Sequence, residues 1–515
     1  MMMSSVTPGS TLIRVDSASK SIGPPFIFYY YYLKIDLSNV FCNKLGYMVY
    51  NYKTEPYEHQ KEALNIGADK NLFAYFMEMG TGKTKVALDN AAMLYNEELV
   101  NVVLVVAPNS VYRNWQDEIN THCPVDTTIH THKKDKKFVR ESTKLSFFLI
   151  NVEAFSRSSG SNAIKNIINE YHDTMMVIID EATTIKNRQA KRTKELTKLC
   201  KPIKYKRILT GSPVTKSPLD LFSQCAFLSP ELLGYTSFYA FRAHFCVMKT
   251  IGVGQSGKQI SLPLYFTNLN ELEQKVKKFS YRVKKVDCLD LPSKVYVKRY
   301  VDLKGSQVQI YNNLKTFARA VFEDKEASYT NRLTEIIKLH QVACGYFVSD
   351  TGEKKDIDNP KLDELMNIIE ETDGKMIIWA NYIHNIEKII DKLKSVYGDE
   401  STVSIYGAVS VDDRQEAVSN FQTNKNTRFF VGNPTTGGYG LNLTAASTVV
   451  YFSNNYDLEV RQQSEDRAHR IGQKNNVTYI DIITRNTIDE FIIKALNKKL
   501  KISAQTLGEE ILEFL

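Results

Sequence analysis

Short, continuous apolar runs that end in polar or glycine-containing turns occur in two series along this chain of 515 residues. The first series begins after Met48 and reads NLFAYFMEM, NVVLVVAP, LSFFLINV, MMVIIDEA and YKRILTGSP. The second begins near residue 375 and reads KMIIWAN, TVSIYGA, TRFFVGNP, STVVYFSN and VTYIDIIT. Such runs, separated by amphipathic stretches, are typical of strands buried in a parallel sheet with helices on both faces. The sequence therefore predicts an α/β fold with two parallel-sheet lobes.

The pattern between and after the two series sets the predicted boundaries. Residues 48–232 form the first lobe and residues 346–494 the second. In residues 233–345, aromatic and aliphatic side chains recur at helical spacing, which predicts mainly helical insertions or a linker, with one extended piece at SKVYVKRYVDL. Residues 495–515 are predicted to complete an amphipathic C-terminal helix.

Residues 1–47 differ from the rest of the chain. They open with a stretch rich in Ser, Pro and Gly without helical or strand period, followed by the aromatic run FIFYYYYLKI. We expect a disordered or non-native extension, with Met48 close to the functional start. No apolar run approaches the roughly 20 residues that a membrane-spanning helix needs.

Charge and cysteine content narrow the class of protein only slightly. The net charge of +8 fits a polyanionic partner without identifying one. The 7 cysteines include no C-x-x-C pair, which argues against a disulfide framework or a zinc ribbon. We expect free thiols in a reducing cytoplasm, that of a prokaryotic host or a virus-infected cell.

The peptide MEMGTGKT follows an apolar strand and precedes a helical stretch, which is the context that a P-loop requires. Lys83 would contact the β- and γ-phosphates of ATP, and the Thr84 hydroxyl would bind Mg²⁺. One departure is Met77, which occupies the position of the first glycine in G-x-x-x-x-G-K-[ST]. The predicted nucleotide-binding residues of this loop are Met79, Gly80, Thr81, Gly82, Lys83 and Thr84.

The peptide MMVIIDEA supplies two carboxylates at the end of a buried strand. Asp180 would hold Mg²⁺, and Glu181 would orient or deprotonate the attacking water. Solvated acids at a strand end are the alternative, and the P-loop upstream argues against it. After another strand, RILTGSP places Thr210 and Gly211 in a turn able to sense the nucleotide.

The order of the P-loop, APNSVYRNW, DEA, LTGSP, GGYGLNLTAASTVVYF and RAHRIGQ resembles the helicase superfamily-two ATPases of the SWI/SNF group. The resemblance covers nearly everything after Met48, and the compact chain looks most like bacteriophage or bacterial members. It implies two RecA-like lobes with helical insertions between them. It also implies a DNA-dependent ATPase that uses ATP and Mg²⁺.

The resemblance assigns further nucleotide contacts. Gln60 in PYEHQ would read the adenine, and Gly440 would lie near the nucleotide. Arg467 and Arg470 match the arginine fingers of the family, and Gln463 would line the same cleft together with Gln473. The three-residue spacing of the arginines predicts that both guanidinium groups lie on one helix face. The predicted catalytic residues are thus Lys83, Asp180, Glu181, Arg467 and Arg470.

Nucleic-acid contacts are predicted at turns in both lobes, where backbone N–H groups and hydroxyls can hold phosphates without reading bases. In the first lobe these residues are Pro108, Ser110, Arg113, Asn151, Thr210 and Gly211. In the second lobe they are Thr435, Thr436, Gly437, Gly438 and Asn442. For Trp115 we expect helix packing, whereas Arg414 could be structural or contact a phosphate.

Together these features predict an ATP-dependent translocase on double-stranded DNA, a monomeric motor that remodels or displaces DNA-bound complexes. By resemblance it would track 3′→5′ without separating strands. The alternatives are a strand-separating helicase in replication or repair, a non-hydrolysing DNA-binding protein with a relic ATPase fold, and RNA as the track.

Overall fold

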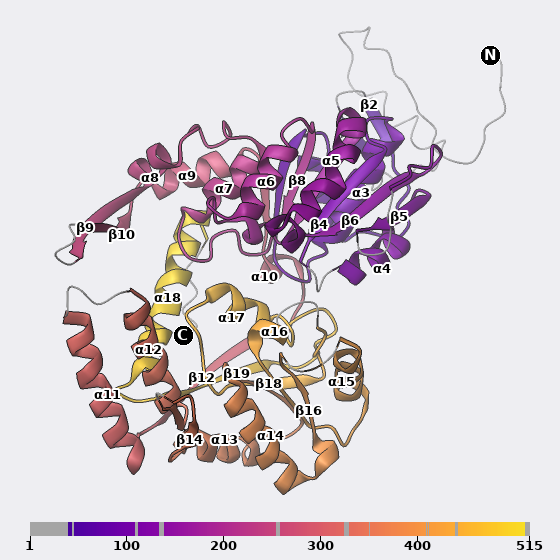
Figure 1. Ribbon diagram of the computed structural model, residues 1–515. Coiled ribbons are helices and arrows are strands. Elements are labelled where there is room, and N and C mark those ends of the chain that lie inside the picture. Colours follow the sequence, from indigo (N-terminus) through magenta and orange to yellow (C-terminus); the bar gives the residue numbers. More distant parts are fainter. Residues whose placement is uncertain are drawn as a thin grey trace, which may run out of the picture. The chain divides into compact units, whose positions relative to one another are not determined.

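The computed structural model describes residues 40–43, 46–108, 112–132, 138–253, 258–323, 329–349, 351–407, 409, 411–437 and 441–509. The chain divides into two compact units. Unit one holds the chain up to Gly211 with the segments Ala226–Ser229 and Lys277–Lys284, and unit two holds Ser212–Cys225, Pro230–Val276 and Lys285–Leu515 (Figure 1). Most of the predicted N-terminal extension lies outside the described residues, apart from a strand pair, β1 (Val40–Asn43) and β2 (Gly46–Val49).

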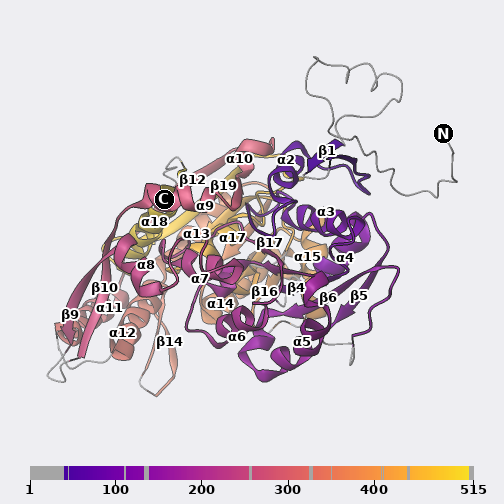
Figure 2. The same ribbon diagram turned by 90° about the horizontal axis from the view of Figure 1, so that it is seen from above.

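Unit one is built on a seven-stranded sheet in the order β11-β3-β8-β7-β4-β6-β5. Its strands are β3 (Leu72–Met77), β4 (Val102–Ala107), β5 (Thr127–Thr131), β6 (Leu145–Asn151), β7 (Met175–Asp180), β8 (Tyr205–Leu209) and β11 (Ser280–Val283). All neighbouring pairs are parallel, and β4, β6 and β5 run side by side in Figure 1 and Figure 2. Every residue of β4 and β7 is buried, as the unbroken apolar runs in the sequence predict.

Unit two is built on a six-stranded parallel sheet in the order β12-β19-β18-β15-β17-β16. Its strands are β12 (Lys294–Val301), β15 (Lys375–Trp379), β16 (Thr402–Ile405), β17 (Phe429–Gly432), β18 (Ala446–Tyr451) and β19 (Val477–Thr484). Side chains alternate between two cores, because successive residues of a strand point to opposite faces. Ile378 packs in one core with Ile386 and Leu393, and Trp379 packs in the other with Phe421.

The helices surround these sheets and form the insertions. In unit one and its neighbouring segments they are α2 (Glu58–Gly67), α3 (Lys83–Asn96), α4 (Tyr112–His122), α5 (Ser158–Tyr171), α6 (Lys191–Leu199), α7 (Asp220–Leu228), α8 (Phe238–Phe245) and α9 (Leu269–Lys277). Further along lie α10 (Lys285–Cys288), α11 (Ser306–Glu323), α12 (Tyr329–Ala343), α13 (Pro360–Glu370), α14 (Ile383–Tyr397), α15 (Val411–Thr423), α16 (Pro434–Gly437), α17 (Leu458–Glu465) and α18 (Ile488–Leu507). None of the helices in the described parts of the chain has the length and apolar character to cross a membrane.

The predicted fold class is confirmed: two lobes, each with a parallel sheet between helices. The segment 233–345 is less helical than expected. It contains the antiparallel hairpin of β9 (Cys246–Val253) and β10 (Lys258–Phe266). It also contributes β11 to the sheet of unit one and β12 to the sheet of unit two. β11 was missed because three of its four residues are polar and half-buried, so they leave no apolar run in the sequence.

The C-terminal helix α18 begins at a polar cap and is held to unit two by a buried ion pair. The Thr487 side chain caps the helix by accepting a hydrogen bond from the Asp489 N–H. The Asp489 carboxylate lies 2.6 Å from Lys361 Nζ on α13 and also accepts from the Thr484 N–H. Gly508 ends the helix at a φ of 66°, a backbone conformation that suits glycine.

Arg207 in β8 is a fully buried charge of unit one and has no carboxylate in contact among the described residues. Its guanidinium group donates to Asn90 Oδ1 and to the main-chain oxygens of Gly67, Lys70, Asn71 and Lys206. These bonds satisfy the carbonyls that end α2 and lead into β3 and β8. Burial lowers the pKa of Arg207, because removal from water disfavours the charged form. The hydrogen bonds that its N–H groups donate offset this free-energy cost.

We expect Arg207→Met to destabilise unit one by roughly 3 kcal/mol, because it leaves buried carbonyl groups without donors. Calorimetric unfolding should show a lower midpoint for the transition of this unit. The exposed Arg157 provides the control, and Arg157→Met should leave the midpoint nearly unchanged. Equal midpoints for the two variants would contradict the structural role of Arg207.

Candidate functional site

The P-loop joins β3 to α3 through two glycines in the left-handed region. Gly80 and Gly82 have φ values of 83° and 82°, so side chains there would be strained. A Cβ atom on Gly82 would lie 2.0 Å from Gln60 Nε2, so the close approach of α2 also requires glycine. α3 begins at Lys83 and continues through the half-buried Thr84, which places both predicted ligands at a helix N-terminus.

Two side chains of α2 contact the backbone of the P-loop. Gln60 Nε2 donates to Thr81 O at 3.0 Å, and His59 Nε2 lies 2.8 Å from the same oxygen. The Thr81 hydroxyl in turn donates to Glu78 O at 2.8 Å. The structure thus places Gln60 directly against the nucleotide loop, while Met79 and Gly80 lie on the more accessible side of the turn.

The two predicted acids meet the P-loop lysine at the end of β7. Lys83 Nζ lies 2.7 Å from Glu181 Oε1, and both side chains are largely buried. Glu181 adopts a φ of 49°, a left-handed conformation that costs a non-glycine residue about 1–3 kcal/mol. Its N–H donates to Asp180 Oδ1 at 2.9 Å. Burial raises the pKa of Asp180, and Lys83 opposes this shift.

Trp115 corrects one of our expectations. Its indole is buried as expected for a packing residue, but Nε1 also donates to Asp180 Oδ2 at 3.0 Å. Trp115 therefore orients the carboxylate that we expect to hold Mg²⁺. No local pattern in the sequence indicates this contact, because 65 residues separate the two partners.

The turn after β8 packs against the P-loop rather than facing solvent. Thr210 is fully buried, and a Cβ atom on Gly211 would lie 3.2 Å from Glu78 Cα. The structure places these two residues at the nucleotide loop, in keeping with the predicted nucleotide-sensing turn, and their predicted contact with nucleic acid stays a prediction. Arg282 of β11, which belongs to none of the predicted motifs, donates to Gly211 O at 2.7 Å and to Glu78 Oε1 at 3.3 Å.

In unit two, the arginines predicted on one helix face lie beyond the helix. α17 ends at Glu465, and Arg467 and Arg470 follow in consecutive turns. The regular helix stops because Arg467 O accepts from the Leu443 N–H at 3.1 Å, a tertiary bond that draws the chain aside. Arg467 is buried, and Arg470 Nη1 donates to Leu441 O at 3.3 Å.

The two glutamines of this peptide have different surroundings. Gln463 lies on α17, where its amide donates to Glu459 at 3.4 Å. Gln473 donates to the carbonyls of Thr444, Ala446 and Ala468 and accepts from two backbone N–H groups. With both ends of its amide engaged, Gln473 is a structural clamp rather than the cleft residue we expected.

The described nucleic-acid candidates of unit two lie in the short helix α16, which follows β17, and just beyond it. The Thr435 N–H and hydroxyl both donate to Asn433 Oδ1, and the Thr436 N–H donates to Asn433 O. Gly437 ends α16 there, and the exposed Asn442 follows. Gly438 and Gly440 lie outside the described residues.

In unit one, Pro108 is buried at the end of β4 and Asn151 is half-buried at the end of β6. Both residues therefore lie at the same edge of the sheet as the P-loop. Ser110 and the Arg113 side chain lie outside the described residues. Arg414, for which two roles were open, donates from Nε to Val409 O at 3.1 Å, which supports the structural role.

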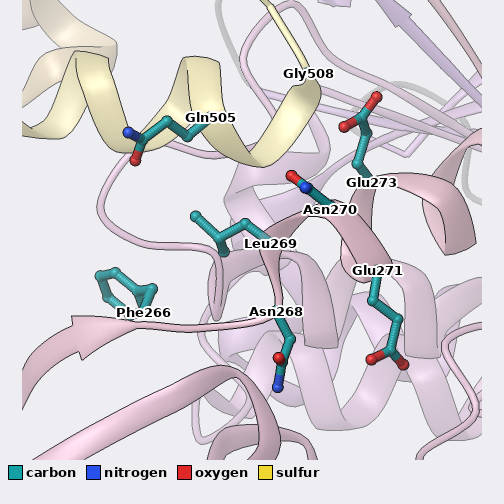
Figure 3. A pocket seen from close by; sticks show the side chains of 8 residues that line it. All are labelled: Phe266, Asn268, Leu269, Asn270, Glu271, Glu273, Gln505 and Gly508. Carbon is teal, nitrogen blue, oxygen red and sulfur yellow. The ribbon is translucent and has the colours of Figure 1, made fainter.

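A pocket of about 630 Å³ lies in unit two, and none of the motif residues lines it (Figure 3). Glu271 and Glu273 of α9 line it together with Asn270 and Gln505. Carboxylates would repel a triphosphate, so this pocket is unsuited to a nucleotide. The predicted nucleotide-binding residues of unit one lie at the edge of its sheet instead.

Comparison with known proteins identifies the family. A model of the SNF2-related domain matches residues 71–348, and a helicase conserved C-terminal domain matches residues 360–472. The chain belongs to the SNF2-related family. The resemblance inferred from the motifs is thus confirmed, and so is the prediction of an ATP-hydrolysing enzyme at the level of this family.

Several SNF2-related proteins are similar over most of the chain. The uncharacterized ATP-dependent helicase MG018 of Mycoplasma genitalium is 29% identical over 84% of this chain and 40% of its own length. The ATP-dependent helicase fft1 of Schizosaccharomyces pombe is 24% identical over 83% of this chain and 50% of its own. Human DNA annealing helicase and endonuclease ZRANB3 is 26% identical over 84% of this chain and 38% of its own length. The chain thus spans half or less of these relatives' lengths.

Among solved structures, the Sulfolobus solfataricus SWI2/SNF2 ATPase core in complex with dsDNA is 24% identical to the chain. The match covers 90% of this chain and 98% of the core, with a TM-score of 0.40.

The residues of unit one fit ATP and Mg²⁺. The N-terminus of α3 offers N–H groups and Lys83 to phosphates, and Asp180 offers a buried carboxylate. No cluster of three or more His, Cys, Asp or Glu side chains that could hold a metal occurs in the described parts of the chain. Proteins bind Mg²⁺ through one or two carboxylates together with substrate phosphates, and Asp180 supplies such a carboxylate.

The Trp115–Asp180 hydrogen bond gives a prediction for this SNF2-related site. Trp115→Phe keeps the packing but removes the donor, which we expect to lower kcat/KM for ATP by roughly 10–100-fold. A titration of ATPase activity with Mg²⁺ should show a weaker apparent affinity. Trp379 is the matched control, because among the described residues its buried Nε1 has no partner. Equal activity of Trp115→Phe and Trp379→Phe would refute the role of Trp115.

Proposed function

We propose that this chain is an ATP-dependent translocase on double-stranded DNA, which couples hydrolysis to movement and displaces or remodels DNA-bound complexes. The observation that carries the proposal is the cluster of Lys83, Asp180 and Glu181 at the sheet edge of unit one. Their contacts match a phosphate ligand, a metal ligand and a base for water. The SNF2-related family supplies the link to a DNA-stimulated motor.

The Lys83–Glu181 ion pair suggests how substrate binding prepares hydrolysis. Lys83 is a point charge with three donors, so it can turn from the carboxylate to the γ-phosphate of ATP. Glu181 would then lose its ion-pair partner and become able to accept a proton from the attacking water. Asp180 would hold Mg²⁺, which would neutralise the phosphate charge when bound.

Arg467 and Arg470 of unit two would complete the reaction. A guanidinium group is always charged and planar, which suits a phosphoryl group that gains charge in the transition state. In the proposed cycle these arginines reach the nucleotide when the lobes close, so that hydrolysis and closure depend on each other. Gln463 would support the arginines from the preceding helix.

The proposed track is the phosphate backbone of duplex DNA. Thr435 and Thr436 of α16, and the exposed Asn442 further along, offer hydroxyl, amide and N–H groups, which can hold phosphates without base specificity. The net charge of +8 favours a polyanion. The relative ZRANB3 is named a DNA annealing helicase, which supports DNA over RNA.

One observation favours strand separation as a second candidate function. The β9–β10 hairpin is a separate two-stranded sheet, and Leu262, Leu264 and Tyr265 are each at least half exposed on it. Apolar side chains of this kind can wedge between stacked bases. A hairpin that enters a fork would turn movement into unwinding.

Loss of the P-loop lysine tests the ATPase. We expect Lys83→Ala to lower DNA-stimulated ATP hydrolysis by at least ~100-fold, because a phosphate donor and the partner of Glu181 are removed together. Lys70→Ala, at an exposed lysine, should retain activity. The assay should compare duplex DNA, single strands and duplex RNA. Activity that persists in Lys83→Ala, or wild-type activity that no nucleic acid stimulates, would overturn the proposal.

Paired strand assays separate the two candidate functions. With ATP, we expect disruption of a DNA triplex but no separation of a plain duplex, since a translocase displaces what is bound ahead of it. Lys83→Ala is inactive in both assays if displacement needs hydrolysis. Efficient duplex unwinding that Tyr265→Ser abolishes would instead establish the wedge role of the hairpin.

A further inference from the structure

A short segment of unit two contacts the peptide that carries the predicted arginine fingers. We call Lys285–Lys294 the connector and Asp466–Arg470 the arginine turn. Lys285 Nζ donates to Asp466 Oδ1 at 2.6 Å and to His469 O at 2.9 Å. Lys285 is buried, with 4% of its surface exposed, so its charge is little screened by water.

The far end of the connector contacts the same turn. His469 Nε2 lies 2.8 Å from Pro292 O, and Lys294 Nζ lies 3.1 Å from Glu465 Oε2. The connector then continues into β12, and just before that strand Ser293 O accepts from the Val477 N–H. The two ends of one segment therefore hold the arginine turn at Asp466 and His469, and the preceding residue Glu465 as well.

These anchors lie next to the two arginines in sequence. Asp466 precedes Arg467, and His469 precedes Arg470. Beyond Glu465 the described local backbone bonds are those of turns, such as the Arg467 N–H to Ser464 O at 3.3 Å. A regular helix would hold its side-chain directions by itself, whereas a series of turns depends on outside contacts.

The electrostatics agree with a strong anchor. Burial raises the pKa of the Asp466 carboxyl, but Lys285 and Lys294 outweigh this and lower it overall. Asp466 is thus an anion near neutral pH, and the ion pair with Lys285 is intact. The pKa of Glu465 is also lowered overall, with Lys294 and Arg461 opposing the effect of burial.

The connector also begins next to a residue that contacts the nucleotide loop. Arg282, three positions before Lys285, belongs to unit one and donates to Gly211 O and Glu78 Oε1. At this point the chain passes from one unit to the other. Along this stretch of backbone, Arg282 is therefore bonded to Glu78 within unit one, and three residues later Lys285 is bonded to the arginine turn within unit two.

We propose that Lys285 is a positioning residue for hydrolysis, which holds Arg467 and Arg470 in the orientation that stabilises the transition state. The inference rests on the proposed function, because it presumes that these arginines act on ATP. Lys285 contacts no reacting atom. Its effect is exerted through the arginine turn.

Lys285→Met tests this role, because methionine keeps the volume but removes the ammonium group. We expect kcat for DNA-stimulated ATP hydrolysis to fall about 10–100-fold, as for a misplaced catalytic group, with KM for ATP nearly unchanged. Lys298→Met, at an exposed lysine on β12, is the matched control and should retain full activity. A rise in KM with unchanged kcat would refute the proposal.

A double-mutant comparison separates positioning from general damage. In a background of Arg467→Ala and Arg470→Ala, adding Lys285→Met should lower the residual kcat by less than about 3-fold, because no arginine remains to be positioned. A further 10–100-fold loss in that background would mean that Lys285 acts elsewhere. If Arg467→Ala alone leaves hydrolysis intact, the proposed function fails, whereas retention of kcat in Lys285→Met alone overturns only this inference.

A second variant tests whether Lys285→Met lowers kcat only because it leaves the buried Asp466 carboxylate unpaired and the protein misfolded. Lys285→Met combined with Asp466→Asn leaves no buried charge of this pair, and thermal unfolding should confirm a folded protein. We expect kcat to stay low, because the bond to His469 O is still missing. Recovery of kcat in this variant would show that Lys285 only neutralises Asp466, and the positioning role would be wrong.

Discussion

Parallel pairing of every strand in the two main sheets is the constraint on which the rest of the structure depends. It sends the carboxyl end of each strand to the same edge of its sheet. In unit one, β3, β8 and β7 are neighbours, so the loops that follow them meet there. Lys83 and Glu181 come within 2.7 Å although 98 residues separate them. The sheet thus assembles the site, and the loops contribute only the final side chains.

Unit two positions its charged side chains by a different means. Its arginines lie in turns after a helix, where no strand end determines their direction. Buried ion pairs lie next to them instead: Arg461 of α17 bonds to Asp481 and Glu465, and Lys285 bonds to Asp466. An ion pair inside a protein contributes little net stability, because desolvation offsets the attraction. Its geometry is strict, however, and this suits a segment whose orientation matters more than its stability.

The sequence predicted those features that are written into a short stretch of chain, such as the unbroken apolar runs of β4 and β7 and the adjacent acids Asp180 and Glu181. Contacts between distant residues left no such pattern, and Trp115 looked like a packing residue because its partner lies 65 positions away. The predicted helix through Arg467 was wrong for a related reason, since helical spacing is a local preference that tertiary contacts override. Local chemistry was therefore predictable, whereas side-chain direction in a turn is decided by partners elsewhere in the chain.

The environments of the two adjacent acids give a physical basis for their different roles. Glu181 is paired with the Lys83 ammonium group, which can be exchanged for a phosphate. Asp180 receives a hydrogen bond from a neutral indole, and burial raises its pKa although the Lys83 charge opposes this shift. A buried carboxylate of this kind gains most from a divalent metal, whereas a carboxylate released from a lysine gains a proton-accepting role. In the proposed mechanism, two neighbouring positions at one strand end would thus acquire separate functions through their different partners.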